Sequence, residues 1–150
     1  MEEKDYRLSS MPSAMCRVQI KRYGEHCEEQ SIEVNLWSYY THVLTINYFA
    51  DSQRLELSAT GTYSATTARH INRFTGEFLG RNYYHEIKRA CDKNRRFNYD
   101  DFPVTVELEN SDYELDCFFK ALDYYAKDGK RFYDYTKSEI ERFNAHRWGW

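Results

Sequence analysis

Apolar and polar residues alternate through the first sixty positions of the chain, a period that predicts β-strands. The alternation begins at Val18 and Ile20 and continues through residues 31–37, 42–49 and 54–59. Each segment carries its apolar side chains two positions apart, so that one face of the strand is hydrophobic. We therefore predict an antiparallel meander that is buried on one face.

Beyond Gly61 the spacing of the apolar residues lengthens to three and four, which predicts helices. The first helix should begin after Ser64, a good N-cap residue, and end at Gly80, with Gly76 as a point where it could break. Its predicted buried face consists of Ala68, Ile71, Phe74 and Phe78. A second helix is predicted over residues 82–93.

Two capping boxes mark helices in the last third of the chain. In each box a hydroxyl residue is followed three positions later by glutamate, Ser111 by Glu114 and Thr136 by Glu139. Before them, residues 103–110 alternate again and predict a late strand. The elements together predict an α+β fold, in which an antiparallel sheet of about four to five strands, mostly N-terminal, packs with about four helices.

Residues 1–15 show no clear period and are predicted to form a loose N-terminal arm, whereas residues 16–150 are predicted to form a single domain. No apolar run has the length that a signal peptide or a membrane span requires. We therefore expect a cytoplasmic protein without a membrane partner. In that reducing compartment the four cysteines are expected to be free thiols.

The charge of the chain is nearly balanced, with a formal net charge of −3 and with acids and bases mixed along its length. This balance removes the strongest argument for nonspecific binding of nucleic acid, which needs a basic excess or a basic face. The aromatic content of 17%, including 14 tyrosines, exceeds what a core of this size can use. The surplus favours either a protein interface or tyrosines at the core boundary with hydrated hydroxyls.

The densest group of hydroxyl, basic and imidazole side chains is the segment YSATTARH, residues 63–70, at the start of the first helix. On that helix Thr66, His70, Arg73 and Glu77 are predicted to share an exposed polar stripe. Helix capping with a solvated stripe is the favoured interpretation, and the alternatives are contact with a partner and an anion or catalytic site. The candidate contact residues of this segment are Tyr63, Ser64, Thr66, Arg69, His70 and Arg73.

Catalysis is the weaker interpretation of this segment. A histidine base needs a nucleophile within hydrogen-bond reach, and Ser64 lies on a different side of the predicted helix from His70. No pair of the five histidines has the spacing of metal ligands, and the chain has no C-x-x-C pair. We predict no catalytic residue, metal or cofactor, and keep a small hydrolase acting on a nucleotide signal through His70 as the enzymatic alternative.

Arginines and aromatic residues are interleaved in the C-terminal segments KRFYDY and ERFNAHRWGW. Such side chains stack the bases of single-stranded nucleic acid or anchor a protein interface. Because Asp134 lies within the first segment and would repel phosphate, a protein partner is favoured over nucleic acid. The candidate contact residues of this region are Arg131, Tyr133, Arg147 and Trp148.

The tract over residues 63–72 resembles one that small proteins of bacteriophages and mobile elements carry. In those proteins a Tyr-Ser-x-Thr-Thr-x-Lys/Arg-His-x-Asn tract follows a strand hairpin. The matching residues here are Tyr63, Ser64, Thr66, Thr67, Arg69, His70 and Asn72.

This resemblance implies a phage-encoded accessory protein similar to anti-CRISPR proteins. Such a protein would bind a bacterial host protein or ribonucleoprotein complex in the host cytoplasm and block one of its surfaces without catalysis. A nucleic-acid-binding regulator is the alternative function. The sequence is also compatible with a homodimer.

Overall fold

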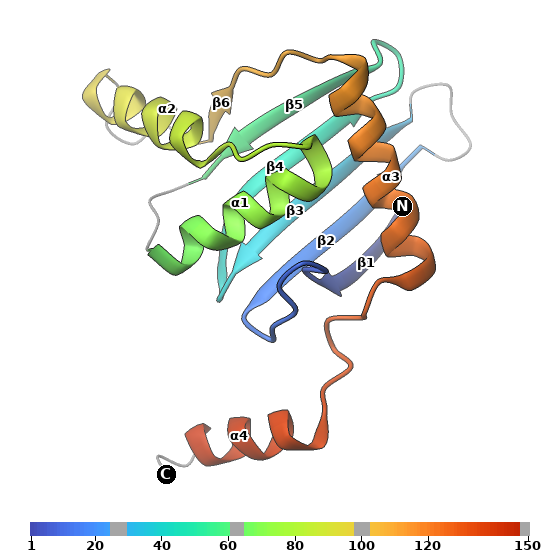
Figure 1. Cartoon of the computed structure of the whole chain (residues 1–150), viewed down its shortest axis with the longest axis vertical. Coiled ribbons are helices and arrows are strands. Elements are labelled where there is room, and N and C mark those ends of the chain that lie inside the picture. Colours follow the sequence, from blue (N-terminus) through green and yellow to red (C-terminus); the bar gives the residue numbers. More distant parts are fainter. Residues whose placement is uncertain (25–29, 61–64, 98–102, 148–150) are drawn as a thin grey trace.

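The computed structural model describes residues 1–24, 30–60, 65–97 and 103–147, of which residues 95–97 and 146–147 are described by their backbone alone. Six strands form one antiparallel sheet whose spatial order follows the chain (Figure 1). The strands are β1 (Glu2–Arg7), β2 (Cys16–Tyr23), β3 (Ser31–Ser38), β4 (Thr41–Phe49), β5 (Arg54–Ala59) and β6 (Val104–Val106). The helices are α1 (Ala65–Leu79), α2 (Tyr84–Phe97), α3 (Asp112–Asp128) and α4 (Lys137–Arg147). The predicted α+β fold is confirmed, with slightly more strands than expected.

Two of the helices form a layer on the sheet. Helices α1 and α3 lie against the same face, and α2 lies beside β6 at one edge (Figure 1). Helix α4 stands apart, beyond the end of the sheet that carries the β3–β4 turn. The described helices therefore cover one face of the sheet, and side chains on the opposite face remain available for other roles.

The core lies between this face of the sheet and the two helices. Because the strands pair in register, the inward residues of neighbouring strands form rows, as Val18, Leu36 and Leu44 do. All three are fully buried. The helices meet over these rows, where the rings of Phe78 in α1 and Tyr125 in α3 stack with centroids 5.5 Å apart. Burial of apolar surface on this scale dominates the stability of a domain of this size.

The first residues form an edge strand, so the prediction of a loose arm over residues 1–15 is wrong for its first half. Strand β1 pairs antiparallel with β2, and the buried Tyr6 lies opposite Val18. The sequence hides this strand because Tyr6 is the one apolar residue of EEKDYR, which leaves no alternation to recognise. The other residues on its inward face, Glu2 and Lys4, form an ion pair at 3.3 Å.

Helix α1 runs from Ala65 to Leu79 without a break at Gly76 and ends at Gly80, as predicted. Gly80 adopts a φ of 78°, a left-handed conformation that favours glycine, and its N–H donates to the carbonyl of Gly76. A Cβ at Gly80 would lie 2.8 Å from Sγ of Cys117 in α3. Glycine is therefore needed both to end the helix and to let α1 approach α3.

Both predicted capping boxes are confirmed. The Glu114 N–H donates to the hydroxyl of Ser111 at 3.2 Å, and its carboxylate accepts from the Ser111 N–H at 3.3 Å. The same exchange joins Thr136 and Glu139, at 3.2 and 3.0 Å. These reciprocal bonds fix the first turns of α3 and α4.

Two further expectations concern thiols and membranes. The cysteines at positions 16, 91 and 117 are thiols that form no disulfide, as predicted, and Cys27 lies outside the described residues. Among the described residues, none of the helices combines the length and the apolar character that crossing a membrane demands.

Candidate binding site at the end of the sheet

An aromatic cavity of about 430 Å³ lies at the end of the sheet that faces α4. Arg17 of β2, with Ala14 and Met15 of the β1–β2 connection, completes its lining. The aromatic side chains come from the end of β3, the β3–β4 turn, the α3–α4 connection and α4. They are Trp37, Tyr39, Tyr40, Phe132, Tyr133, Tyr135 and Phe143, and together with Arg17 we call them the aromatic site.

The turn between β3 and β4 presents two tyrosines to the cavity. A register shift after Leu36 brings Ser38 opposite Thr41, so that only two residues connect the strands. Tyr39 takes a φ of 57°, and its N–H donates to the carbonyl of Met15 at 2.6 Å. This bond ties the turn to the β1–β2 connection and leaves Tyr40 91% exposed at the cavity rim.

Trp37 and Arg17 form the floor of the cavity in a stack on the helix-free face of the sheet. The Trp37 ring lies on the His42 ring, with centroids 5.0 Å apart, and the Arg17 guanidinium lies 4.7 Å from the indole. Arg17 Nη1 donates to the hydroxyl of Tyr133 at 2.8 Å and lies 3.5 Å from a carboxylate oxygen of Asp5. These two ring contacts hold the indole in place, so the floor is formed before any ligand arrives.

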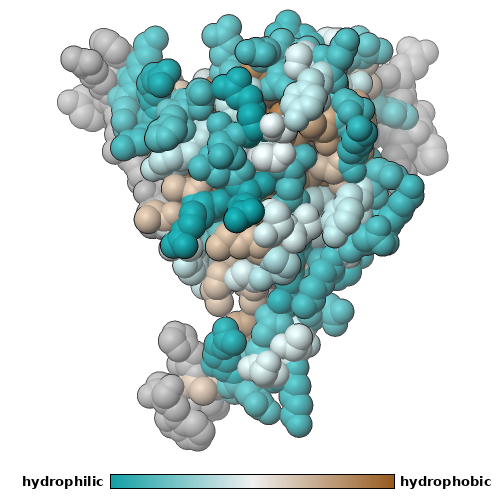
Figure 2. Space-filling model, in the orientation of Figure 1, coloured by the Kyte–Doolittle hydropathy of each residue, from teal (hydrophilic) through white to brown (hydrophobic). Residues whose placement is uncertain are grey.

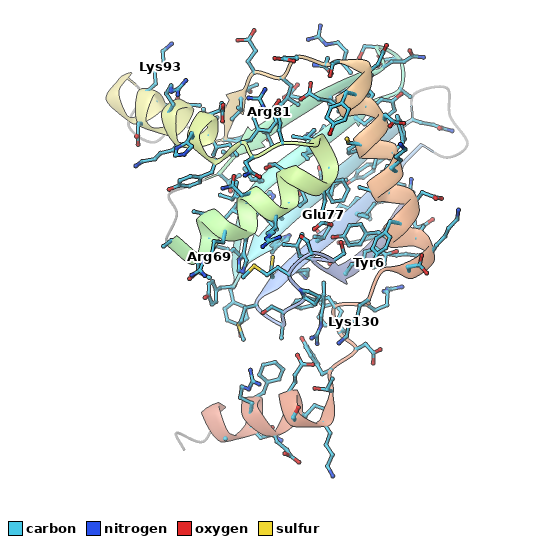
Figure 3. The ribbon with its side chains drawn as sticks, in the orientation of Figure 1. Tyr6, Arg69, Glu77, Arg81, Lys93 and Lys130 are labelled. Carbon is cyan, nitrogen blue, oxygen red and sulfur yellow. The ribbon has the colours of Figure 1, made fainter. Side chains whose placement is uncertain are left out.

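The far wall is held in place by pairing with the edge of the sheet. The Arg7 N–H donates to the carbonyl of Lys130 at 2.8 Å, and the Phe132 N–H donates to the carbonyl of Asp5 at 3.0 Å. Figure 3 shows Lys130 and Tyr6 on the two neighbouring segments. These backbone hydrogen bonds hold the segment that follows α3 against the end of β1. Residues 132–135 therefore lie next to Trp37 and Arg17 on the cavity floor.

An ion pair between a buried arginine and a partly exposed glutamate attaches α4 to the same edge. The guanidinium of Arg7, which is 4% exposed, donates to the carboxylate of Glu139 at 2.7 Å. The Arg7 guanidinium and then the Thr136 amide lower the pKa of Glu139 to about 2. The rings of Tyr135 and Phe143 meet edge to face, with centroids 5.2 Å apart. Helix α4 thus brings Phe143 to the cavity through one charged contact and one aromatic contact.

A hydrogen-bonded network of polar side chains lies beside the floor on the same sheet face. His42 Nε2 lies 3.0 Å from Asn35 Oδ1 and 2.8 Å from Thr45 Oγ1. The Asn35 amide donates to Gln19 at 3.2 Å and to Glu33 at 2.8 Å. Burial is the main cause that lowers the pKa of His42, so the ring under Trp37 is neutral at pH 7.

The structure contradicts the predicted exposure of His70. The side chain is 2% exposed, and its Nδ1 is hydrogen-bonded to the hydroxyl of Ser38 at 2.8 Å. The helix turns this side inward because Ser38, on the buried face of β3, offers both His70 and Thr67 a polar partner. His70 is therefore unable to contact a partner, and the exposed stripe with Thr66 and Arg73 is wrong at this position.

The pair of Ser38 and His70 has the separation of a nucleophile and its base, but both side chains are 2% exposed. A substrate carbonyl has no access to a serine buried beneath a helix. Besides burial, the charge of Arg69 also lowers the pKa of His70. The pair is a structural hydrogen bond between α1 and β3, and it gives no support to a hydrolase.

The other predicted contact residues fall into three groups. Tyr133 lines the aromatic site, and Arg131 lies next to it with its guanidinium 5.4 Å from the Tyr6 ring. Thr66, Arg69 and Arg73 lie on α1, where the two arginines are exposed, and Figure 3 shows Arg69 toward the end of the sheet that faces α4. The remaining candidates, Tyr63, Ser64, Trp148 and the side chain of Arg147, lie outside what the structure describes.

Most of the aromatic site was not predicted from the sequence. The run Trp37-Ser-Tyr-Tyr40, with three aromatics at the end of a predicted strand, is the local signal that could have identified the floor and the turn. Figure 2 shows the helix-covered face as mainly hydrophilic, with apolar residues in separate small patches. Among the described residues, no group of three His, Cys, Asp or Glu side chains could hold a metal ion.

Lowering the pH from 7.5 to 5.5 is expected to destabilise the fold. Burial holds the pKa values of His42 and His70 below the ordinary value of about 6.5, so the unfolded chain takes up protons first. Their contribution to stability is complete above that value and is lost as the pH falls through the folded pKa values. Urea unfolding at the two pH values measures the difference in free energy.

The variant His70→Gln should reduce this pH dependence, whereas His85→Gln, at an exposed position of α2, should leave it unchanged. A free energy of unfolding that is the same at both pH values in the unmodified protein would contradict the expectation.

Residues 9–93, more than half of the chain, match the model of a protein family described as a family of unknown function (DUF8033). The matched stretch contains the floor and turn of the aromatic site, and the wall formed by residues 132–143 lies beyond it. No curated protein and no solved structure matches the chain.

Proposed function

We propose that this chain, which belongs to the DUF8033 family, is a noncatalytic binding protein whose aromatic site holds a protein partner. The observation that carries the proposal is the cavity of about 430 Å³ with seven aromatic side chains around one arginine. Tyrosine, tryptophan and arginine are the residues that dominate the binding energy of protein interfaces. Tyr40 and Tyr133, 91% and 60% exposed, are the side chains that a partner would meet first.

The lining residues support binding rather than catalysis. The described lining contains no carboxylate, thiol or imidazole, which are the groups that transfer protons or attack substrates in most enzymes. Arg17 is its one charged member and is already in contact with Asp5 and Tyr133. A rigid, largely apolar site with one fixed charge suits recognition of a partner side chain.

The charges around the site favour protein over nucleic acid. A protein that binds phosphates needs several unpaired cations, because each neutralised phosphate contributes through release of counterions. Here Arg17 and Arg7 each face a carboxylate, Asp5 and Glu139, and the net charge of the chain is −3. Aromatic rings alone would stack bases, but the backbone phosphates would find few free cations.

The resemblance of residues 63–72 to small phage proteins supplies the context of the proposal. In that context the partner is a bacterial host protein or ribonucleoprotein complex of a defence system, in the cytoplasm of the host cell. Binding through the aromatic site would block a surface of that complex, as an anti-CRISPR-like inhibitor does. The exposed residues Arg69, Arg73 and Arg131 lie outside the cavity and would contribute to the polar rim of the contact.

Affinity capture from nuclease-treated bacterial lysate tests this function. The unmodified protein should retain a host protein, and the double variant Tyr40→Ala/Tyr133→Ala should retain at least about tenfold less, because truncation of a hot-spot aromatic costs about 2 kcal/mol or more. The matched control is Tyr124→Ala, an exposed tyrosine of α3 outside the site. Equal capture by the double variant and by the unmodified protein would overturn the proposal.

A further inference from the structure

We propose that the aromatic site binds a proline-rich segment in the polyproline II conformation, with an acidic residue next to the prolines. This inference rests on the proposed function and names the chemistry of the partner. It is based on the arrangement of the rings and the position of Arg17.

The rings of the site suit proline. Rings from two distant parts of the chain surround the cavity, Trp37 and the β3–β4 turn from one and Phe132, Tyr133 and Tyr135 from the other. Proline packs its flat apolar ring on aromatic faces, and the polyproline II helix loses little entropy when it binds. A cube with the volume of this cavity is roughly 7.5 Å on a side, which at about 3.1 Å per residue accommodates two to three residues of such a helix.

Arg17 determines the charge of the partner segment. Its guanidinium lies 4.7 Å from the Trp37 ring and 5.7 Å from the Phe132 ring, where a cationic ligand of an aromatic cage would otherwise sit. Lysine, arginine and methylammonium groups are therefore disfavoured by like charge. Both described polar contacts of Arg17 use Nη1, so an acidic side chain of the ligand would approach the other nitrogens.

A second copy of this chain is not the occupant. The chain contains two prolines, Pro12 and Pro103, which are far apart in the sequence and form no proline-rich segment. Single-stranded nucleic acid would also stack on the rings, but its row of phosphates needs several cations, and Arg17 is the one charged residue of the described lining. The segment must come from a different protein.

The experiment titrates the full chain with synthetic peptides while the tryptophan indole N–H signals are followed by NMR. The probes are a blocked peptide of one glutamate followed by eight prolines, its lysine counterpart, a glycine-serine peptide of equal length and a ten-nucleotide oligothymidine. The signal of Trp37 is identified by its loss in Trp37→Phe. Saturable binding of the glutamate peptide that shifts this signal is expected, with at least about tenfold weaker binding of the lysine peptide.

The variants assign the binding to the site. Tyr40→Ala, whose side chain is 91% exposed and not needed for folding, should weaken binding of the glutamate peptide by at least about fivefold, and Tyr124→Ala should not. Absence of peptide binding, equal binding by Tyr40→Ala and Tyr124→Ala, or a preference for oligothymidine would overturn this inference. If the peptides fail while lysate capture still depends on Tyr40 and Tyr133, the proposed function stands and only the proline-rich partner is refuted.

Discussion

Replacing Phe78 by alanine is expected to lower the free energy of unfolding by about 3–5 kcal/mol, a large part of the roughly 5–15 kcal/mol that a domain of this size has. Phe78 is fully buried and is the ring through which α1 meets α3. Its centroid lies 5.0 Å from that of Phe74, 5.5 Å from that of Tyr125 and 6.0 Å from that of Phe118. Truncation would remove three ring contacts and leave a cavity between the two helices and the sheet.

Urea or thermal unfolding followed by circular dichroism measures this loss, with Tyr40→Ala as the aromatic control at an exposed position. The control should change the free energy of unfolding by no more than about 0.5 kcal/mol. A binding assay should give the opposite result. Tyr40→Ala should bind the partner more weakly, whereas the folded fraction of Phe78→Ala should bind normally. A loss below about 1 kcal/mol for Phe78→Ala would show that α3 is not a part of the core.

The central strands were predictable because their side chains follow one rule. In β2 to β5 most inward positions are apolar and most outward positions are polar, so the period of two is visible in the sequence. Strand β1 breaks that rule, since two of its three inward positions, Glu2 and Lys4, satisfy each other with an ion pair at the sheet edge. An edge strand that is held by backbone pairing and one tyrosine leaves no periodic signal.

The inward face of α1 shows the second limit of the sequence pattern. Spacing alone assigned His70 to the polar side, because a histidine is usually exposed unless it has a buried partner. That partner is Ser38, thirty-two positions earlier, on the inner face of β3. A polar residue turns inward when the tertiary fold supplies its hydrogen bond, and no local period can reveal such a pair.

The aromatic site was predicted in part for the same reason. The interleaved segment KRFYDY was recognised as a contact region, and Tyr133 does line the cavity. Its opposite wall, Trp37 to Tyr40, lies more than ninety positions earlier in the chain, and the two meet only because residues 130–132 bond to the edge of β1. The strand that the sequence hid is therefore the element that assembles the site.

The attachment of α4 to the edge of β1 can be tested through the ion pair of Arg7 and Glu139. Arg7 is buried on the outer side of β1, and its Nε has no partner within the described residues, so its charge relies on Glu139. Removing one member of a buried pair is costly, by about 3–5 kcal/mol where the other charge cannot reach water. Here release of α4 would let water reach the Arg7 guanidinium, because α4 makes few other contacts with the rest of the protein.

The variant Glu139→Ala is therefore expected to release α4 while the sheet remains folded. Hydrogen exchange should show loss of protection in α4 but not in β2 to β5, and binding at the aromatic site should fall by at least about tenfold as the wall that carries Tyr135 and Phe143 detaches. Because the pKa of Glu139 is lowered to about 2, acid should produce the same release only as the pH falls from the ordinary glutamate value of about 4.3 toward 2.

Two variants separate the ion pair from the other roles of this glutamate. Glu141→Ala, at an exposed position of the same helix, should change neither protection nor binding. Thr136→Val removes the hydroxyl of the capping box but keeps Arg7 opposite Glu139, so it should cost about 1 kcal/mol in α4 and leave the helix docked. If Glu139→Ala keeps both its α4 protection and its binding, the cavity does not depend on this ion pair, and the Arg7 charge must be satisfied by water at the edge of β1.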